Sequence, residues 1–207
     1  MMKISAVLAI LLFMLTSAEA KPITILALGD SLTAGFGLQP SDAFPVKLEA
    51  ALRNKGHDVA VVNAGVSGDT ALDGASRLDW ALSEDVSAVI VELGANDALR
   101  GLPPGQAEQA LDDILTRLKS RGLPVLLAGM RAPPNLGVEY QSAFDGMYQR
   151  LATKHGTLLY PFFLDGVAAD VKLNQADGLH PNPAGVDIIV SRILPMVEEL
   201  IGKAAGK

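Results

Sequence analysis

Five apolar runs in which hydrophobic residues follow one another without alternation are the feature that most constrains how this chain can fold. Continuous apolar runs are typical of strands covered on both faces, which requires a parallel sheet between two layers of helices. The segments between the runs repeat apolar residues at helical spacing. The runs expected to form strands are Ile23–Leu28, Val59–Val62, Ala88–Leu93, Val125–Ala128 and Thr157–Pro161.

This alternation of strands and helices predicts an α/β fold, a three-layer α/β/α doubly wound domain over residues 21–207. We expect a five-stranded parallel sheet in the flavodoxin-like order 2-1-3-4-5. A closing helix is expected from Asn182 to Ile201. Because Pro195 removes one backbone hydrogen bond, the sequence predicts a kink or a break near Arg192.

Residues 1–20 have the pattern of a secretory signal peptide. Lys3 precedes an apolar stretch, and the small-residue site Ala18-Glu19-Ala20 follows it. We expect cleavage after Ala20 and a periplasmic or secreted product. The alternative is a permanent anchor, but the apolar stretch is shorter than the roughly 20 residues that span a bilayer, so no stable membrane insertion is expected.

Charge and cysteine content exclude several classes of function. The formal net charge is −6, and clustered Lys and Arg residues are lacking, so nucleic acid is not an expected partner. The sequence contains no cysteine, so disulfides, thiolate metal sites and a cysteine nucleophile are all excluded.

Polar residues gather where the first three strands are expected to end. The segments that leave these strands read "GDSLTAG", "NAGVSGDT" and "GANDALRG". In an open parallel sheet, ligands bind beyond the carboxyl ends of the strands, at the point where the strand order reverses. The order 2-1-3-4-5 makes these three ends neighbours, so the sequence predicts a site at this edge.

The residues at this edge are those that acyl transfer requires. Ser31 is the candidate nucleophile, and the last loop supplies His180 as a base and Asp177, three residues earlier, as the group that orients it. Candidate donors to an oxyanion are the N–H groups of Ser31 and Gly65 and the side-chain amide of Asn96; at Gly65 the missing side chain lets an oxyanion approach. Singly, each residue has a structural alternative: a helix cap, a surface turn or a turn glycine.

Other residues that could carry chemistry are given different interpretations. Ser67 resembles a nucleophile elbow but is followed two residues later by Asp69 where glycine is required, so Ser31 is preferred. We expect His57 and His155 to be solvated loop histidines. Trp80 is expected to pack against the fold. 

Glu92 ends an apolar strand, and it requires neutralisation, a cation or water.

At these residues the sequence resembles the GDSL, or SGNH, hydrolases. The four blocks of that family match "GDSLTAG", "NAGVSGDT", "GANDALRG" and "DGLHPNPAG", in order through essentially the whole chain after residue 20. Within the family it looks most like the secreted bacterial esterases with acyl-thioesterase, lysophospholipase and arylesterase activities.

The resemblance implies a catalytic triad of Ser31, His180 and Asp177, with Ser31, Gly65 and Asn96 forming the oxyanion hole. It also implies that the loops Asp97 to Leu102 and Pro133 to Val138 shape the acyl site, and that neither a cofactor nor a metal takes part. 

Ala95 departs from the second glycine of many relatives, which makes the chain-length preference less transferable.

These observations favour a serine esterase that cleaves oxyesters or thioesters of small acylated substrates through an acyl-enzyme, and we expect it to be a monomer. An esterase for acetylated sugars or cell-wall glycans is the enzymatic alternative. A nucleotide-binding domain is a further alternative, but this sequence lacks the glycine motif and the lysine that such a domain requires. A metal phosphatase has few histidines to use, and a non-catalytic binding protein remains an alternative.

Overall fold

The computed structural model describes residues 22–206; the predicted signal peptide lies outside the described residues. Its core is a parallel sheet of five strands in the order β2-β1-β3-β4-β5, as predicted from the sequence. The strands are β1 (Ile23–Gly29), β2 (Val59–Gly65), β3 (Val86–Glu92), β4 (Val125–Ala128) and β5 (Leu158–Tyr160).

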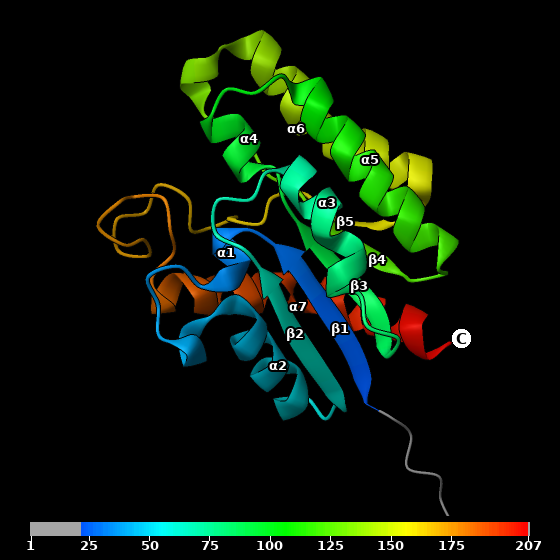
Figure 1. The fold of residues 1–207 in the computed structure, drawn as a ribbon. Coiled ribbons are helices and arrows are strands. Elements are labelled where there is room, and N and C mark those ends of the chain that lie inside the picture. Colours follow the sequence, from blue (N-terminus) through cyan, green and yellow to red (C-terminus); the bar gives the residue numbers. More distant parts are fainter. Residues whose placement is uncertain (1–21, 207) are drawn as a thin grey trace, which may run out of the picture.

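Helices cover both faces of this sheet. Helices α2 and α7 pack together on one face, and α3, α5 and α6 pack in succession on the other (Figure 1). The helices are α1 (Ser31–Ala34), α2 (Phe44–Asn54), α3 (Ala71–Ala81), α4 (Ala95–Leu99), α5 (Pro104–Ser120), α6 (Val138–His155) and α7 (Pro183–Ala205), with 3-10 turns η1 (Pro40–Asp42) and η2 (Pro134–Leu136).

The central strand β1 explains why the functional loops meet. Residues 25–28 of β1 are fully or almost fully buried, because β2 and β3 flank this strand and helices cover it on both sides. Its last residue, Gly29, pairs with Gly65 of β2 and with Glu92 of β3. The segments that follow these three residues therefore leave the sheet side by side, as expected at a switch in strand order.

Strand β2 is longer than the sequence predicts. It continues through Asn63 to Gly65, whereas the apolar run ends at Val62. The strand lies at the edge of the sheet, and Val62 is itself 43% exposed. An edge strand can carry polar residues without burying them, so its polar end does not read as strand.

The predicted break in the closing helix and the predicted packing of Trp80 are both wrong. Helix α7 does not break near Arg192, because the bond lost at Pro195 lies within 23 residues whose apolar side chains are buried before and after it, including Ile193 and Val197. Trp80 does not pack: its side chain is 89% exposed.

The two histidines outside the proposed site are not simply solvated. His155 ends α6, with only 7% of its side chain exposed, and its Nε2 lies 2.7 Å from Asp112. The ring of His57 lies 3.0 Å from Glu198 and is 30% exposed. His155 links α6 to α5, and His57 links the loop before β2 to α7. The local sequence around each histidine does not reveal these contacts.

Candidate active site

Ser31 is the first residue of the short helix α1, directly after β1. Asp30 caps this helix, since its carboxylate accepts a hydrogen bond of 2.9 Å from the Leu32 N–H. The capping predicted as an alternative for Ser31 is thus performed by its neighbour. The Ser31 hydroxyl is left to bond elsewhere, in a residue that is only 9% exposed.

The structure brings Ser31, His180 and Asp177 into one hydrogen-bonded chain. The Ser31 Oγ lies 2.9 Å from Nε2 of His180, and Nδ1 of the same ring lies 2.7 Å from Oδ2 of Asp177. Asp177 also accepts hydrogen bonds from the N–H groups of His180 and Leu179. These backbone bonds, and then the bond to the ring, lower the pKa of Asp177 to about 2, so the carboxylate is charged at neutral pH.

Gln175 and Phe36 hold the loop that carries His180. The Gln175 side chain donates to the carbonyl of Phe36 at 2.7 Å, and its backbone N–H donates to the carbonyl of His180 at 2.8 Å. The Phe36 ring lies 4.7 Å from the His180 ring, centroid to centroid. Sequence reasoning missed both residues, because their roles depend on contacts across more than 130 positions.

The three candidate oxyanion donors differ in how they are bonded. Among the described residues, no hydrogen-bond acceptor is found for the Ser31 N–H. The Gly65 N–H donates to the side-chain oxygen of Asn63 at 2.9 Å. The Asn96 amide donates to Asp30 Oδ2 at 3.1 Å and to the Asp69 carbonyl at 3.0 Å. Two of the three groups therefore have to share or exchange a partner in order to bind an oxyanion.

Two buried carboxyl groups, those of Asp30 and Glu92, lie close to Ser31. Asp30 is fully buried, and burial raises its pKa from 3.8 to about 6, although the Leu32 N–H, His180 and Asn96 act in the opposite direction. Glu92 is also fully buried, and burial followed by the nearby Asp30 raises its pKa well above 4.5. The Thr33 hydroxyl donates to its Oε2 at 2.8 Å. Of the three possibilities left open for Glu92, the structure favours neutralisation by a proton.

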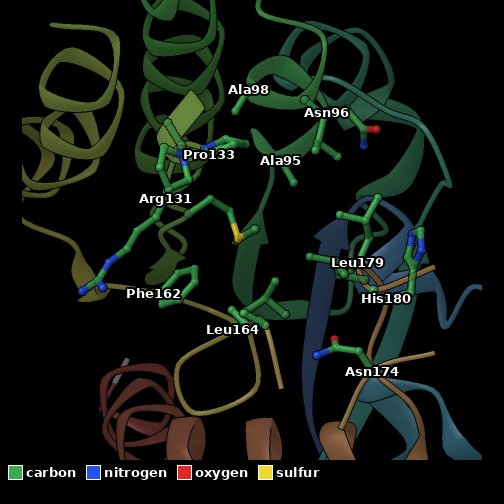
Figure 2. A pocket seen from close by; sticks show the side chains of 18 of the residues that line it. Ala95, Asn96, Ala98, Arg131, Pro133, Phe162, Leu164, Asn174, Leu179 and His180 are labelled. Carbon is green, nitrogen blue, oxygen red and sulfur yellow. The ribbon is translucent and has the colours of Figure 1, made fainter. Parts of the chain in front are cut away.

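A cavity of about 670 Å³ opens beside Ser31 and His180 (Figure 2). Its walls come from the segments after β3, β4 and β5 and from the His180 loop, and they are mainly apolar. Lining residues of the apolar wall include Leu99, Met130, Ala132, Pro133, Phe162, Leu164, Ala168 and Leu179. A pocket of this size and character suits a small organic ligand with an apolar part.

The two loops expected to shape the acyl site do so only in part. From Asp97 to Leu102, the residues lining the cavity are Ala98 and Leu99; Asp97 instead accepts a hydrogen bond from the Ala71 N–H at 2.9 Å. From Pro133 to Val138, only the two prolines line it. 

The sequence prediction missed Met130, Arg131 and Ala132 after β4 and the whole wall after β5, which includes Phe162 and Leu164. Ligands meet the carboxyl ends of the strands in such a sheet, and this rule indicates the segments after β4 and β5 as well as those after the first three strands.

The competing arrangements find less support. Ser67 is exposed in the loop after β2, and no hydrogen bond within residues 22–206 joins it to a histidine. Within the same residues, no three His, Asp or Glu side chains are grouped so that they could hold a metal ion.

A model of the GDSL-like lipase/acylhydrolase family matches residues 27–188, most of the chain and all four loops described above. The chain belongs to this family. Esterase TesA of Pseudomonas aeruginosa is 38% identical over 192 residues, which are 92% of this chain and 96% of that protein. Thioesterase 1/protease 1/lysophospholipase L1 of Escherichia coli K12 is 39% identical over 191 residues, covering 90% of both.

Solved structures of GDSL-family proteins share this fold. A crystal structure of TesA is 39% identical, with a TM-score of 0.81, and the match covers 86% of this chain and 99% of that chain. The esterase AlinE4, described as an SGNH-hydrolase family esterase, is 47% identical with a TM-score of 0.74 over 87% and 97% of the two chains. The expected family and fold are both confirmed.

Proposed function

We propose that this GDSL-family chain is a serine esterase that hydrolyses carboxylic oxyesters and thioesters through an acyl-enzyme on Ser31. The observation that carries the proposal is the unbroken chain of hydrogen bonds from Ser31 Oγ through His180 to Asp177, at the wall of an apolar cavity. The relatives named esterase, arylesterase and thioesterase/lysophospholipase support the same reaction class.

The first half of the reaction forms the acyl-enzyme. The Ser31 hydroxyl gives its proton to His180 Nε2 as its oxygen bonds to the acyl carbon, and the carbonyl oxygen becomes an oxyanion. Asp177 holds the ring with Nδ1 protonated and stabilises the positive charge that develops on it. His180 then returns the proton to the departing alcohol or thiol as the tetrahedral intermediate collapses.

The second half repeats this chemistry with water. His180 takes a proton from water as the water oxygen attacks the acyl group, and it then protonates Ser31 as the acid leaves. In both halves the Ser31 N–H, the Gly65 N–H and the Asn96 amide stabilise the oxyanion. Asn96 reaches it by giving up one of its present acceptors, Asp30 or the Asp69 carbonyl.

A hydrolysis profile over acyl length tests the proposal. We expect turnover of p-nitrophenyl esters from acetate to decanoate, because the cavity of about 670 Å³ has apolar walls. The Ser31→Ala variant is the blank, and it should lose several orders of magnitude in kcat and all reaction with a fluorophosphonate probe. Undiminished turnover by Ser31→Ala would refute the assignment. Activity confined to acetate would favour the alternative, a deacetylase of sugars or cell-wall glycans.

We also propose that residues 1–20 direct export and that the mature enzyme is a monomer. The support for export is the charge and apolar pattern of the sequence; the segment lies outside the described residues. Within residues 22–206, no helix has the length and apolar content needed to cross a bilayer. Amino-terminal sequencing of the exported protein should give Lys21 first, and an intact Met1 would contradict the proposed export signal. Light scattering should give the mass of a monomer, and the mass of a dimer would contradict the proposed monomeric state.

A further inference from the structure

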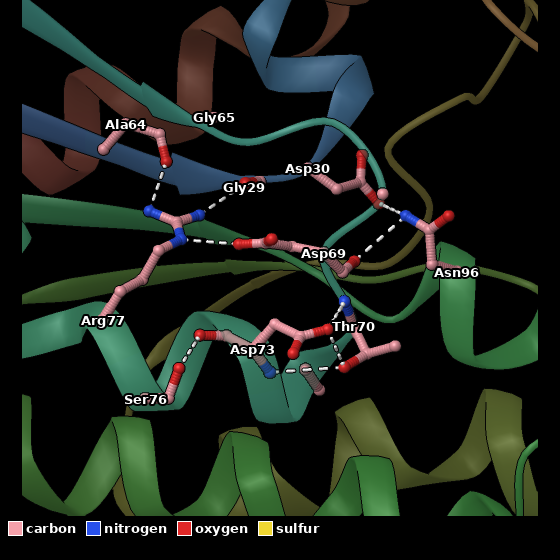
Figure 3. A network of polar contacts seen from close by, with 12 residues as sticks. Gly29, Asp30, Ala64, Gly65, Asp69, Thr70, Asp73, Ser76, Arg77 and Asn96 are labelled. Carbon is pink, nitrogen blue, oxygen red and sulfur yellow. Dashed lines mark hydrogen bonds and ion pairs between the residues drawn. The ribbon is translucent and has the colours of Figure 1, made fainter.

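Arg77 of helix α3 connects the ends of two strands to the loop that follows the second of them (Figure 3). Its guanidinium donates to the Gly29 carbonyl at 2.9 Å, to the Ala64 carbonyl at 2.9 Å and, through Nε, to the Asp69 carboxylate at 2.5 Å. The Arg77 and Asp69 side chains are only 17% and 13% exposed. The planar guanidinium is suited to this, because its five N–H groups point in fixed, divergent directions.

Each of these three acceptors belongs to a segment that carries or contacts one of the proposed oxyanion donors. Gly29 is two residues before Ser31. The Ala64 carbonyl belongs to the same peptide group as the Gly65 N–H. The Asp69 backbone carbonyl accepts the hydrogen bond from Asn96 at 3.0 Å. One side chain therefore contacts all three segments that position these donors.

The charge of Arg77 also acts on one of the donors, the Gly65 N–H. A hydrogen bond to a carbonyl polarises its peptide group and strengthens the N–H on the other side as a donor. For the peptide that joins Ala64 to Gly65, the partner of the carbonyl is a cation, and hydrogen bonds of this kind are about twice as strong as neutral ones. Because the Asp69 carboxylate is paired to the same cation, it contributes little net negative charge near the developing oxyanion.

We propose that Arg77 is a positioning residue for acyl transfer, which holds the Ser31, Gly65 and Asn96 donors in register and polarises the Gly65 N–H. This inference rests on the proposed function, since it gives Arg77 a role only if these groups stabilise an oxyanion. Arg77 does not line the cavity, so it does not contact the acyl group. Its loss should therefore lower kcat much more than it changes KM.

The test compares Arg77→Met with Arg53→Met on p-nitrophenyl butyrate. Arg53 is a matched control, because it too reaches from a helix to a carbonyl of β2, that of Val59 at 2.9 Å, but at the opposite end of the strand. We expect Arg77→Met to lower kcat about 10- to 100-fold, less than the 10²- to 10³-fold typical of a whole oxyanion donor, with KM within about threefold. Arg53→Met should retain the wild-type kcat.

A second comparison separates positioning from a general loss of structure. The fold loss in kcat that Arg77→Met causes should be at least about threefold smaller in an Asn96→Ala background than in the wild type. The reason is that Arg77 and Asn96 act through the same oxyanion. Equal factors in the two backgrounds would overturn the proposal. If Arg77→Met does not fold, Arg77→Lys replaces it: a single ammonium cannot reach all three acceptors, so kcat should fall at least about fivefold.

The outcomes distinguish this inference from the function on which it rests. Wild-type kcat in Arg77→Met, or in Arg77→Lys where that variant stands in, together with a large loss in Asn96→Ala, would refute the role of Arg77 alone. Wild-type kcat in Ser31→Ala would refute the proposed function itself.

Discussion

The buried carboxyl of Asp30 should make the folded enzyme less stable as the pH rises from about 4 to about 6. Asp30 is fully buried, and burial raises its pKa from 3.8 to about 6. The folded protein therefore binds the Asp30 proton more tightly than the unfolded chain does. Below pH 3.8 both states are protonated, so stability does not change through this group; between the two values only the unfolded chain releases the proton, and unfolding is favoured.

The size of the effect follows from the two pKa values. At about 1.4 kcal/mol for each pKa unit, a rise from 3.8 to about 6 lowers the free energy of unfolding by about 3 kcal/mol, with the full loss reached above pH 6. Other acids change stability in the opposite direction: hydrogen bonds from Thr70 lower the pKa of Asp73, for example. The contribution of Asp30 is therefore visible only as a difference between two variants.

The pair to compare is Glu92→Gln and Glu92→Gln/Asp30→Asn. Glutamine imitates the protonated Glu92, which removes the coupling between the two carboxyl groups. Unfolding by urea should be followed by circular dichroism at pH 4, 5, 6 and 7, because Trp80, the one tryptophan, is already 89% exposed and will report poorly on unfolding. Relative to the double variant, Glu92→Gln should lose about 2.5 kcal/mol between pH 4 and pH 7, because the carboxyl of the unfolded chain is already partly ionised at pH 4.

A constant difference between the two variants across this range would refute the reasoning. It would mean that Asp30 keeps an ordinary pKa in the folded state, through water or hydrogen bonds that offset its burial. A fixed offset at every pH, from hydrogen bonds that asparagine makes differently, would not count, because only the change with pH measures proton binding.

Three further predictions concern the site. Asn96→Ala should lower kcat on p-nitrophenyl butyrate by about 10²- to 10³-fold, and near-wild-type turnover would remove it from the oxyanion hole. Asp177→Ala should lower kcat less than Ser31→Ala does, because Asp177 orients His180 and does not itself react; a larger loss in Asp177→Ala in the same assay would contradict this. Gly65→Ala places a Cβ 2.3 Å from the Ala34 nitrogen, so a thermal melt should show a loss of about 1–3 kcal/mol; an unchanged Tm would mean that α1 can shift freely.

The fold was predictable because its strands are buried on both faces, so that each is a continuous apolar run in the sequence. The local pairing of Asp177 with His180 was predictable too, since three residues in a tight loop bring a carboxylate to a ring. The contact of His180 with Ser31 spans 149 positions, and it could be expected only after the strand order had been inferred. Site geometry at long range was thus predicted through topology rather than directly.

Trp80 shows an error that the sequence itself could have corrected. The apolar stripe of its helix includes Leu78, which is fully buried, and a residue two positions later on a helix points to the opposite side. The expectation of packing relied on the usual burial of aromatic residues instead of on this spacing. The role of Arg77, in contrast, could not be found from the sequence. A charged residue on a helix is expected on a solvated face, and only the structure reveals the three acceptors that Arg77 contacts.

Gly65 shows where sequence reasoning reaches its limit. The argument from the sequence is that a missing side chain leaves room for an oxyanion. In the structure, a Cβ on Gly65 would instead lie 2.3 Å from the Ala34 nitrogen and 2.8 Å from the Asp30 carbonyl oxygen, so the missing side chain allows α1 to pack against β2. Both arguments require glycine, and a sequence contains nothing that separates them. They differ only in the direction in which the absent side chain would point: into the space of an oxyanion, or toward α1, as it does in the structure.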